Sequence, residues 1–177
     1  LANLTASVDP YEDVVVSPDG RFSAKLRVNW ADLSEKPAIE IWDKNGTLLW
    51  EVEYQFSEVS PRSIMEILAW APDSSKVYFY YPYWYEAWYT IFKGSHLQSV
   101  DPETGEVKDV IAGCCIDFDF SEDMNRIAYT SEIRVGIKDL VSGIDKSVEI
   151  LPHTFSQSGR IYLSPSGERA IFHTLDG

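Results

Sequence analysis

The amino-acid sequence predicts an all-β protein built from repeated four-stranded antiparallel sheets, and three observations lead to this fold class. A turn motif between two apolar runs occurs four times, at intervals of 43–54 residues. A second Asp…Gly motif follows each of the first three copies. Hydrophobic residues make up 45% and aromatic residues 14% of the 177 residues, which is the composition of a folded chain.

The first motif has the chemistry of a tight hairpin turn. Its four copies lie around Asp19, Asp73, Asp123 and Ser166. In the first copy, Pro18 presets φ, Asp19 can accept a hydrogen bond from the backbone beyond it, and Gly20 tolerates a positive φ. The third copy, SEDMN, lacks both proline and glycine, and the fourth, SPSG, has serine in place of aspartate.

The second motif predicts another hairpin in each of the first three units. Its Asp/Gly pairs are Asp43 and Gly46, Asp101 and Gly105, and Asp139 and Gly143. Four antiparallel strands in about 40–50 residues are typical of a β-propeller blade. We therefore expect about three and a half blades, with units at 13–53, 65–111 and 114–151 and an incomplete one at 158–177.

The SPDG, APDS and SPSG turns resemble the TolB-like, WD-repeat-like propeller repeat, in which a strand ending in D…G follows the SPDG turn. The resemblance covers the chain from about Val14 to Phe172. It implies a β-propeller that serves as a protein-binding platform, an enzyme accessory domain or, less often, a catalytic scaffold. It also favours an extracytoplasmic location, periplasmic or secreted.

The count of about three and a half blades predicts that this chain is a portion of a larger propeller. The alternative is a four-bladed ring, in which the segment LANLTAS supplies a strand to the last unit. The chain begins with Leu1 and stops inside a strand-like run, which fits the first interpretation better. An open arc would expose apolar faces on its terminal blades, and a partner chain or further blades would cover them.

The net charge narrows the range of partners. Fifteen basic and 28 acidic residues give a formal charge of −13. A surface this acidic repels nucleic acids and anionic membranes. The sequence also contains no apolar run of about 18 residues, so we expect no membrane span.

The segment 78–92 is the strongest candidate for a binding site, because ten of its fifteen residues are aromatic. We expect a strand over Val77–Tyr81, ended or marked as an edge by Pro82, and then an insertion on the face opposite the Asp…Gly turns. Tyrosine and tryptophan suit a surface for a protein, a peptide or a saccharide. The alternative is that these rings pack on neighbouring blades. The candidate contact residues are Trp30, Tyr83, Trp84, Tyr85, Trp88 and Tyr89.

Asp117 and Asp119 are a second, weaker candidate site. Residues two apart on a strand share a face, so both carboxylates point the same way. They could bind a cation or a cationic group of a partner, or they could accept hydrogen bonds from neighbouring backbone. No calcium-loop pattern is present, and we predict no cofactor.

No catalytic motif occurs in the chain, whether that of a metalloprotease, an α/β-hydrolase, a P-loop or a dinucleotide fold. The sequence therefore predicts a non-catalytic propeller module that binds a protein, a peptide or a saccharide. Two alternatives stay open. One is an accessory domain of a serine-peptidase-like hydrolase or a polysaccharide lyase, and the other is an assembly domain that pairs through open blade edges.

Overall fold

The computed structural model describes residues 14–28, 36–53, 65–87, 90–111, 117–131, 134–149 and 160–173, with their side chains except those of 81–96 and 173. These residues form fourteen β-strands and no helix, which confirms the predicted all-β class. None of the described segments is therefore a helix with the length and hydrophobicity that crossing a bilayer requires.

The first two sheets are complete four-stranded antiparallel blades whose spatial order follows the chain. Blade 1 contains β1 (Val14–Val16), β2 (Phe22–Arg27), β3 (Ala38–Asp43) and β4 (Leu48–Glu53). Blade 2 contains β5 (Glu66–Trp70), β6 (Val77–Ala87), β7 (Thr90–Val100) and β8 (Val107–Asp109).

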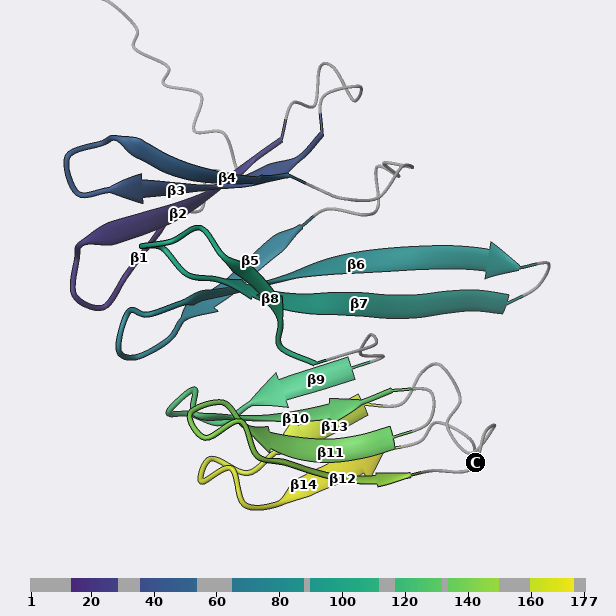
Figure 1. Cartoon of the computed structure of the whole chain (residues 1–177). Helices are drawn as coiled ribbons and strands as arrows, with labels where there is room; N and C mark the ends of the chain where they lie inside the picture. Colours follow the sequence, from purple (N-terminus) through teal and green to yellow (C-terminus); the bar gives the residue numbers. More distant parts are fainter. Residues whose placement is uncertain are drawn as a thin grey trace, which may run out of the picture.

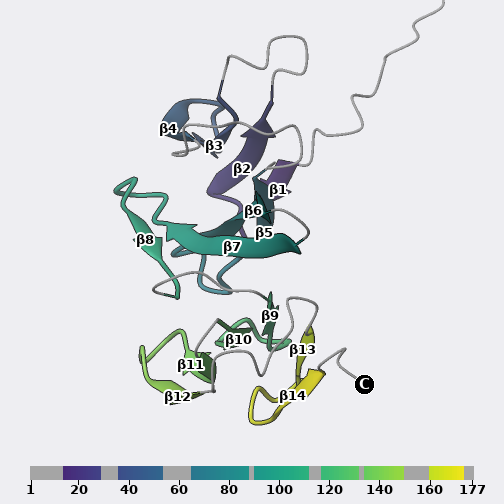
Figure 2. The same cartoon turned by 90° about the vertical axis from the view of Figure 1, so that its right-hand side faces the viewer.

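Blade 3 repeats this arrangement, whereas the last sheet has two strands in the described part of the chain. Blade 3 contains β9 (Asp117–Phe120), β10 (Arg126–Thr130), β11 (Arg134–Asp139) and β12 (Asp145–Glu149). The half-blade, blade 4, contains β13 (Arg160–Leu163) and β14 (Ala170–His173). Figures 1 and 2 show blades 1, 2 and 3 in a row and β13–β14 beside blade 3.

The blades pack face to face, and the core lies between them. Apolar side chains of blade 1, such as Ile39 and Ile41, cluster with Val77, Phe79 and Val100 of blade 2. A second cluster joins blades 2 and 3, where the Tyr78 and Phe120 ring centroids are 5.5 Å apart and those of Tyr80 and Phe118 also 5.5 Å. The short turns lie on one side of this stack, on the left in Figure 1.

The outward face of blade 1 carries exposed apolar side chains beside an ion-pair network. Val14 and Val16 of β1 lie on this face and are 50% and 59% exposed, as expected for a terminal blade. Ile39 and Ile41 face blade 2, so Glu40 between them lies on the outward face. There Arg27 forms ion pairs with Glu40 at 3.1 Å and with Glu51 at 3.0 Å. The outward face of blade 1 is therefore mixed, with an ion-pair network at its centre and exposed valines on its first strand.

Candidate functional site

Strands β6 and β7 extend beyond their sheet as a two-stranded arm, which we define as residues 81–87 and 90–96. The two strands pair in unbroken register from Val77↔Val100 to Ala87↔Thr90. Strand β5 pairs with β6 only as far as Tyr80, and β8 pairs with β7 only from Gln98 onward. No other described strand pairs with the arm, which projects from blade 2 on the side away from the turns (Figure 1).

The predicted insertion is therefore a continuation of the strands on the expected side of the blade. Of the two predictions for Pro82, the end of the strand is wrong, and the edge position fits, because β5 does not pair with β6 beyond Tyr80. The backbone of Tyr83, Trp84 and Tyr85 belongs to β6 and pairs with β7. Pro82 fits inside the strand because β5 has already ended at that point, so no partner requires an N–H from residue 82 on that side. Trp30, Trp88 and Tyr89 lie outside the described residues.

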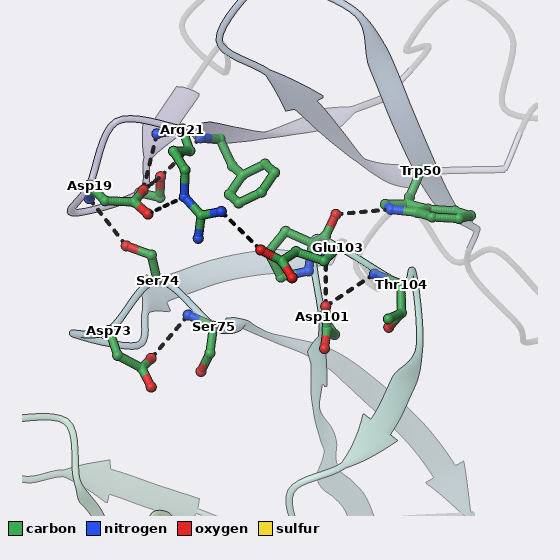
Figure 3. A network of polar contacts seen from close by, with 12 residues as sticks. Asp19, Arg21, Trp50, Asp73, Ser74, Ser75, Asp101, Glu103 and Thr104 are labelled. Carbon is green, nitrogen blue, oxygen red and sulfur yellow. Dashed lines mark hydrogen bonds and ion pairs between the residues drawn. The ribbon is translucent and has the colours of Figure 1, made fainter.

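The turn side of blades 1 and 2 is held by a polar network (Figure 3). Asp19 accepts hydrogen bonds from Ser17 Oγ at 2.8 Å and from the backbone N–H of Arg21 at 3.0 Å. The Arg21 guanidinium donates to Asp19 at 2.6 Å and to Glu103 of blade 2 at 2.9 Å. These bonds, chiefly that of the Arg21 side chain, hold the pKa of Asp19 far below its usual range. The Asp19 N–H donates to Ser74 Oγ at 3.1 Å, which is a second link between the blades.

Two tryptophans join the same pair of blades. The Trp50 indole N–H donates to the Pro102 carbonyl at 3.0 Å, and that of Trp70 donates to the Val15 carbonyl at 2.9 Å. The Trp50 ring also lies against Gly105, where a Cβ atom would come within 2.5 Å of the ring. Trp50 and Trp70 therefore have a structural role in the interface between blades 1 and 2.

The residues predicted for the turns occupy turns between neighbouring strands. Pro18 and Asp73 lie in the first turns of blades 1 and 2. Positive φ values of 70–80° occur at Gly20, Gly46, Gly105 and Gly143. The equivalent of Gly20 is Ser74 in blade 2 and Met124 in blade 3, with φ of 63° and 56°. Ser74 accepts the inter-blade bond from Asp19 and Met124 packs on the second core cluster, so both use their side chains despite the backbone strain.

Asp117 and Asp119 join blade 3 to the half-blade. Asp117 Oδ2 accepts the backbone N–H of Ile161 at 2.9 Å, and Asp119 Oδ2 accepts that of Leu163 at 2.8 Å. This is the backbone-bonding alternative that the sequence left open. Within the described ranges, no three His, Cys, Asp or Glu side chains gather in a way that could hold a metal ion.

The shifted pKa values offer no acid–base pair that works near neutral pH. Asp19, Asp43, Asp73, Asp123 and Asp139 all have lowered pKa values, in each case because the carboxylate accepts hydrogen bonds within its own turn. Burial raises the pKa of Tyr78, Tyr80 and Tyr129 above the usual value. These groups keep one protonation state across the physiological range, so they suit a structural or binding role better than proton transfer.

The solved structures that are similar to this chain include two that illustrate the likeness. A protein described as TolB from Agrobacterium tumefaciens shares 19% identity, over 93% of this chain and 55% of its own length, with a TM-score of 0.43. Dipeptidyl peptidase 4 from Porphyromonas gingivalis shares 14% identity, over 86% of this chain and 21% of its own, also with a TM-score of 0.43. This chain thus spans about half of the first protein and about a fifth of the second. No protein-family model and no curated protein matches it.

Proposed function

We propose that this propeller segment is a non-catalytic binding module and that the arm is its partner-binding element. The observation that supports this role is the length of the arm. Strands β6 and β7 have 11 residues each, whereas the other strands have three to six. An isolated two-stranded hairpin is at best marginally stable in water, so a hairpin that leaves its sheet gains from packing against a partner.

The sequence of the arm suits this role. It contains Tyr83, Trp84 and Tyr85 on β6 and Phe92 on β7. Aromatic residues supply much of the binding energy in protein interfaces. Both outer edges of the arm pair with no described strand, and a peptide partner could add a strand there. We therefore favour a protein or peptide partner over a saccharide.

An arm-less variant tests the proposal. Residues 82–95 are replaced by Asn-Gly, a sequence that favours a two-residue hairpin turn between Tyr81 and His96, which already pair. Wild type and variant are applied to a peptide array and to an oligosaccharide array, and their folding is compared by circular dichroism and thermal unfolding. We expect the variant to fold and to lose peptide binding.

A double substitution, Trp84→Ala with Trp88→Ala, refines this test, and Leu48→Ala serves as a control because Leu48 is 42% exposed on blade 1. Binding to oligosaccharides alone would identify a saccharide module. Unfolding of the double variant would assign the rings to local packing. Unchanged peptide binding without the arm would refute the proposal.

A second role, assembly through open blade edges, is supported by the half-blade. Strand β14 pairs with β13 on one side and with no described strand on the other. Ile171 of β14 is 70% exposed, and Tyr162, its register partner on β13, is 53% exposed. An apolar, unpaired strand is a template for pairing with another chain.

A further inference from the structure

The first turns of blades 1 and 2 share a backbone hydrogen bond but differ in their side chains. Asp19 accepts the backbone N–H of Arg21 at 3.0 Å, and Asp73 accepts that of Ser75, also at 3.0 Å. Ser75 therefore occupies in blade 2 the position of Arg21 in blade 1. Blade 2 has no guanidinium at the place from which Arg21 reaches across to the next blade.

The second turns of blades 2 and 3 correspond in the same way. Asp101 accepts the backbone N–H of Glu103 at 2.8 Å, and Asp139 accepts that of Val141 at 3.1 Å. Val141 therefore takes the position of Glu103. Both members of the Arg21–Glu103 ion pair that links blades 1 and 2 are thus replaced by uncharged residues between blades 2 and 3.

A groove of about 360 Å³ lies at this place, between the turns of blades 2 and 3, and we call it the turn-side groove. Tyr78, Met124 and Leu140 give it an apolar floor, and all three belong to the cluster that joins the two blades. Val141 extends this apolar surface outward, since it is 79% exposed. The residues of both blades that line the groove include Asp73, Ser75, Tyr78, Met124, Leu140 and Val141.

Asp73 supplies a negative charge to the turn-side groove. Hydrogen bonds from Ser75 are the main cause of its lowered pKa, so the carboxylate is ionised at neutral pH. Lys76 also lines the groove, but its charge is the smallest of the causes that lower this pKa. Asp73 forms no ion pair with a described residue. Burial and the charge of Asp73 raise the pKa of Tyr78, which fits a carboxylate that lies near the floor of the groove.

The interface of blades 1 and 2 shows which group fits such a carboxylate. The Arg21 guanidinium donates to Asp19 at 2.6 Å and to Glu103 at 2.9 Å, and it lies 4.9 Å from the centre of the Phe22 ring. An arginine can use its guanidinium for a carboxylate and its aliphatic stem for apolar surface. The turn-side groove offers both kinds of surface, but the residue beside its carboxylate is a serine.

We propose that the turn-side groove binds an arginine side chain presented by a protein partner. The guanidinium pairs with Asp73, as that of Arg21 does with Asp19, and the aliphatic stem lies on the apolar floor. An apolar residue next to this arginine in the partner packs on Val141, which is why we favour a protein over a small molecule. The formal charge of −13 favours the approach of a basic partner.

This site is separate from the arm. The groove lies between turns on one side of the stack, whereas the arm projects from the other side (Figure 1). Figure 3 shows the side chains of Asp73 and Ser75 directed away from Arg21. The inference therefore does not rest on the proposed function of the arm. A single exposed ion pair gives weak binding, which a washed peptide array does not retain but NMR in solution detects.

Three probes test the proposal on the 177-residue chain. They are a capped Leu-Arg-Leu peptide, the same peptide with citrulline as a neutral analogue of arginine, and free L-arginine amide. Two-dimensional NMR follows the backbone amides of residues 73–76 and 140–142 as each probe is added. We expect the arginine peptide to shift these amides and the citrulline peptide to bind about fivefold more weakly, because an exposed ion pair contributes modestly. Arginine amide should also bind more weakly, since it lacks the flanking apolar side chains.

Asp73→Asn tests the role of the carboxylate. Asparagine keeps an acceptor for the Ser75 N–H and removes the charge, so the affinity for the arginine peptide should fall about fivefold. Asp123→Asn is the matched control, because Asp123 is the equivalent residue of blade 3 and lies outside the lining of the groove. This control should bind the peptide as the wild type does.

The double variant Ser75→Arg with Val141→Glu builds the ion pair of the first interface into the second. Its own arginine should occupy the groove and abolish the shifts that the peptide causes. Both positions are exposed, so the substitutions remove no buried contact. Circular dichroism and thermal unfolding check the folding of every variant.

Three results would overturn the proposal: no shift of the groove amides at any concentration of the arginine peptide, equal affinity for the citrulline peptide, or unchanged affinity in Asp73→Asn. Arginine amide that binds as tightly as the peptide would overturn the choice of a protein partner. The variant without residues 82–95 separates this site from the arm. Shifts that persist in that variant would support an independent groove, and their loss would assign peptide binding to the arm alone.

Discussion

The first and the last blade interface use different chemistry for the same task. Blades 1 and 2 are joined by a large apolar cluster, two tryptophans and the Arg21–Glu103 ion pair. Blade 3 and the half-blade are joined mainly by hydrogen bonds to Asp117 and Asp119 and by the Arg126 bond to the Ser166 carbonyl. The difference shows that two inner strands are enough to fix the position of one blade against the next. The outer two strands are the ones that bury the apolar face of the neighbouring blade.

Equivalent isoleucines should show the largest contrast. Ile41 is fully buried between blades 1 and 2, and Ile137 is half-buried at the equivalent position of blade 3. We expect Ile41→Ala to lower the free energy of unfolding by about 2–5 kcal/mol. Ile137→Ala should cost about 1 kcal/mol or less. Denaturant unfolding of dilute protein checks both values, and equal losses would show that the two interfaces are equally buried.

Two glycines separate backbone strain from packing. Gly105 and Gly143 have φ of 72° and 74°, but only at Gly105 would a Cβ atom meet a neighbour, the Trp50 ring. We expect Gly143→Ala to cost about 1 kcal/mol through its φ alone. Gly105→Ala should cost about 2–4 kcal/mol, because overpacking against the ring adds to the same strain. Thermal unfolding of the two variants measures the difference, and a smaller loss at Gly105 would contradict the assigned packing.

The carboxylates of β9 should control the docking of the half-blade. Replacing Asp117 or Asp119 by alanine leaves an N–H of β13 without its acceptor, which should cost about 1–3 kcal/mol in each case. Asparagine keeps an acceptor oxygen and serves as the matched control. Hydrogen exchange at Ile161 and Leu163 provides the local measurement. Faster exchange should be confined to the half-blade, and unchanged protection in both alanine variants would rule out the two bonds.

Acid should destabilise the first turns of blades 1, 2 and 3, which contain an aspartate. It should not affect the turn of the half-blade, which has Ser166 at that position. The folded-state pKa of Asp19 lies below its ordinary value of 3.8, so the unfolded chain binds its proton first as pH falls. The stabilisation that ionised Asp19 gives the folded state is complete above about pH 4. It is lost as the pH falls toward the folded-state pKa. We expect Asp19→Asn to reduce the acid dependence of unfolding, a small effect because the group is exposed. Urea unfolding across this pH range checks it, with Ser166→Ala as the variant expected to show no change.

The sequence predicted the repeat and the turns because their chemistry is local. Pro18, Asp19 and Gly20 each constrain the backbone within a few residues, so the turn needs no tertiary information. The ion-pair network on the outward face of blade 1 could not be predicted in the same way. It depends on the register that places Arg27 near Glu40 and Glu51, and register is a property of paired strands.

The arm shows the same limit at the candidate site. Pro82 indicates the end of a strand when it is considered alone. In the structure β6 continues past Pro82, because the pairing of β5 with β6 stops at Glu66 and Tyr80. No strand on that side therefore requires an N–H from residue 82. The aromatic segment was found from composition, but its shape depends on where neighbouring strands stop.

The two bonds from β13 to β9 have a consequence for how sheets can be stacked. Residues two apart on a strand are about 6.4–6.8 Å apart, and this spacing applies both to the carboxylates of Asp117 and Asp119 and to the N–H groups of Ile161 and Leu163. A pair of side chains on one sheet thereby fixes the longitudinal position of a strand in the next, with no shared backbone ladder. An Asp-x-Asp strand facing a bare strand edge is thus a transferable alignment device, which designers of layered β-proteins could place wherever two sheets must meet in one register.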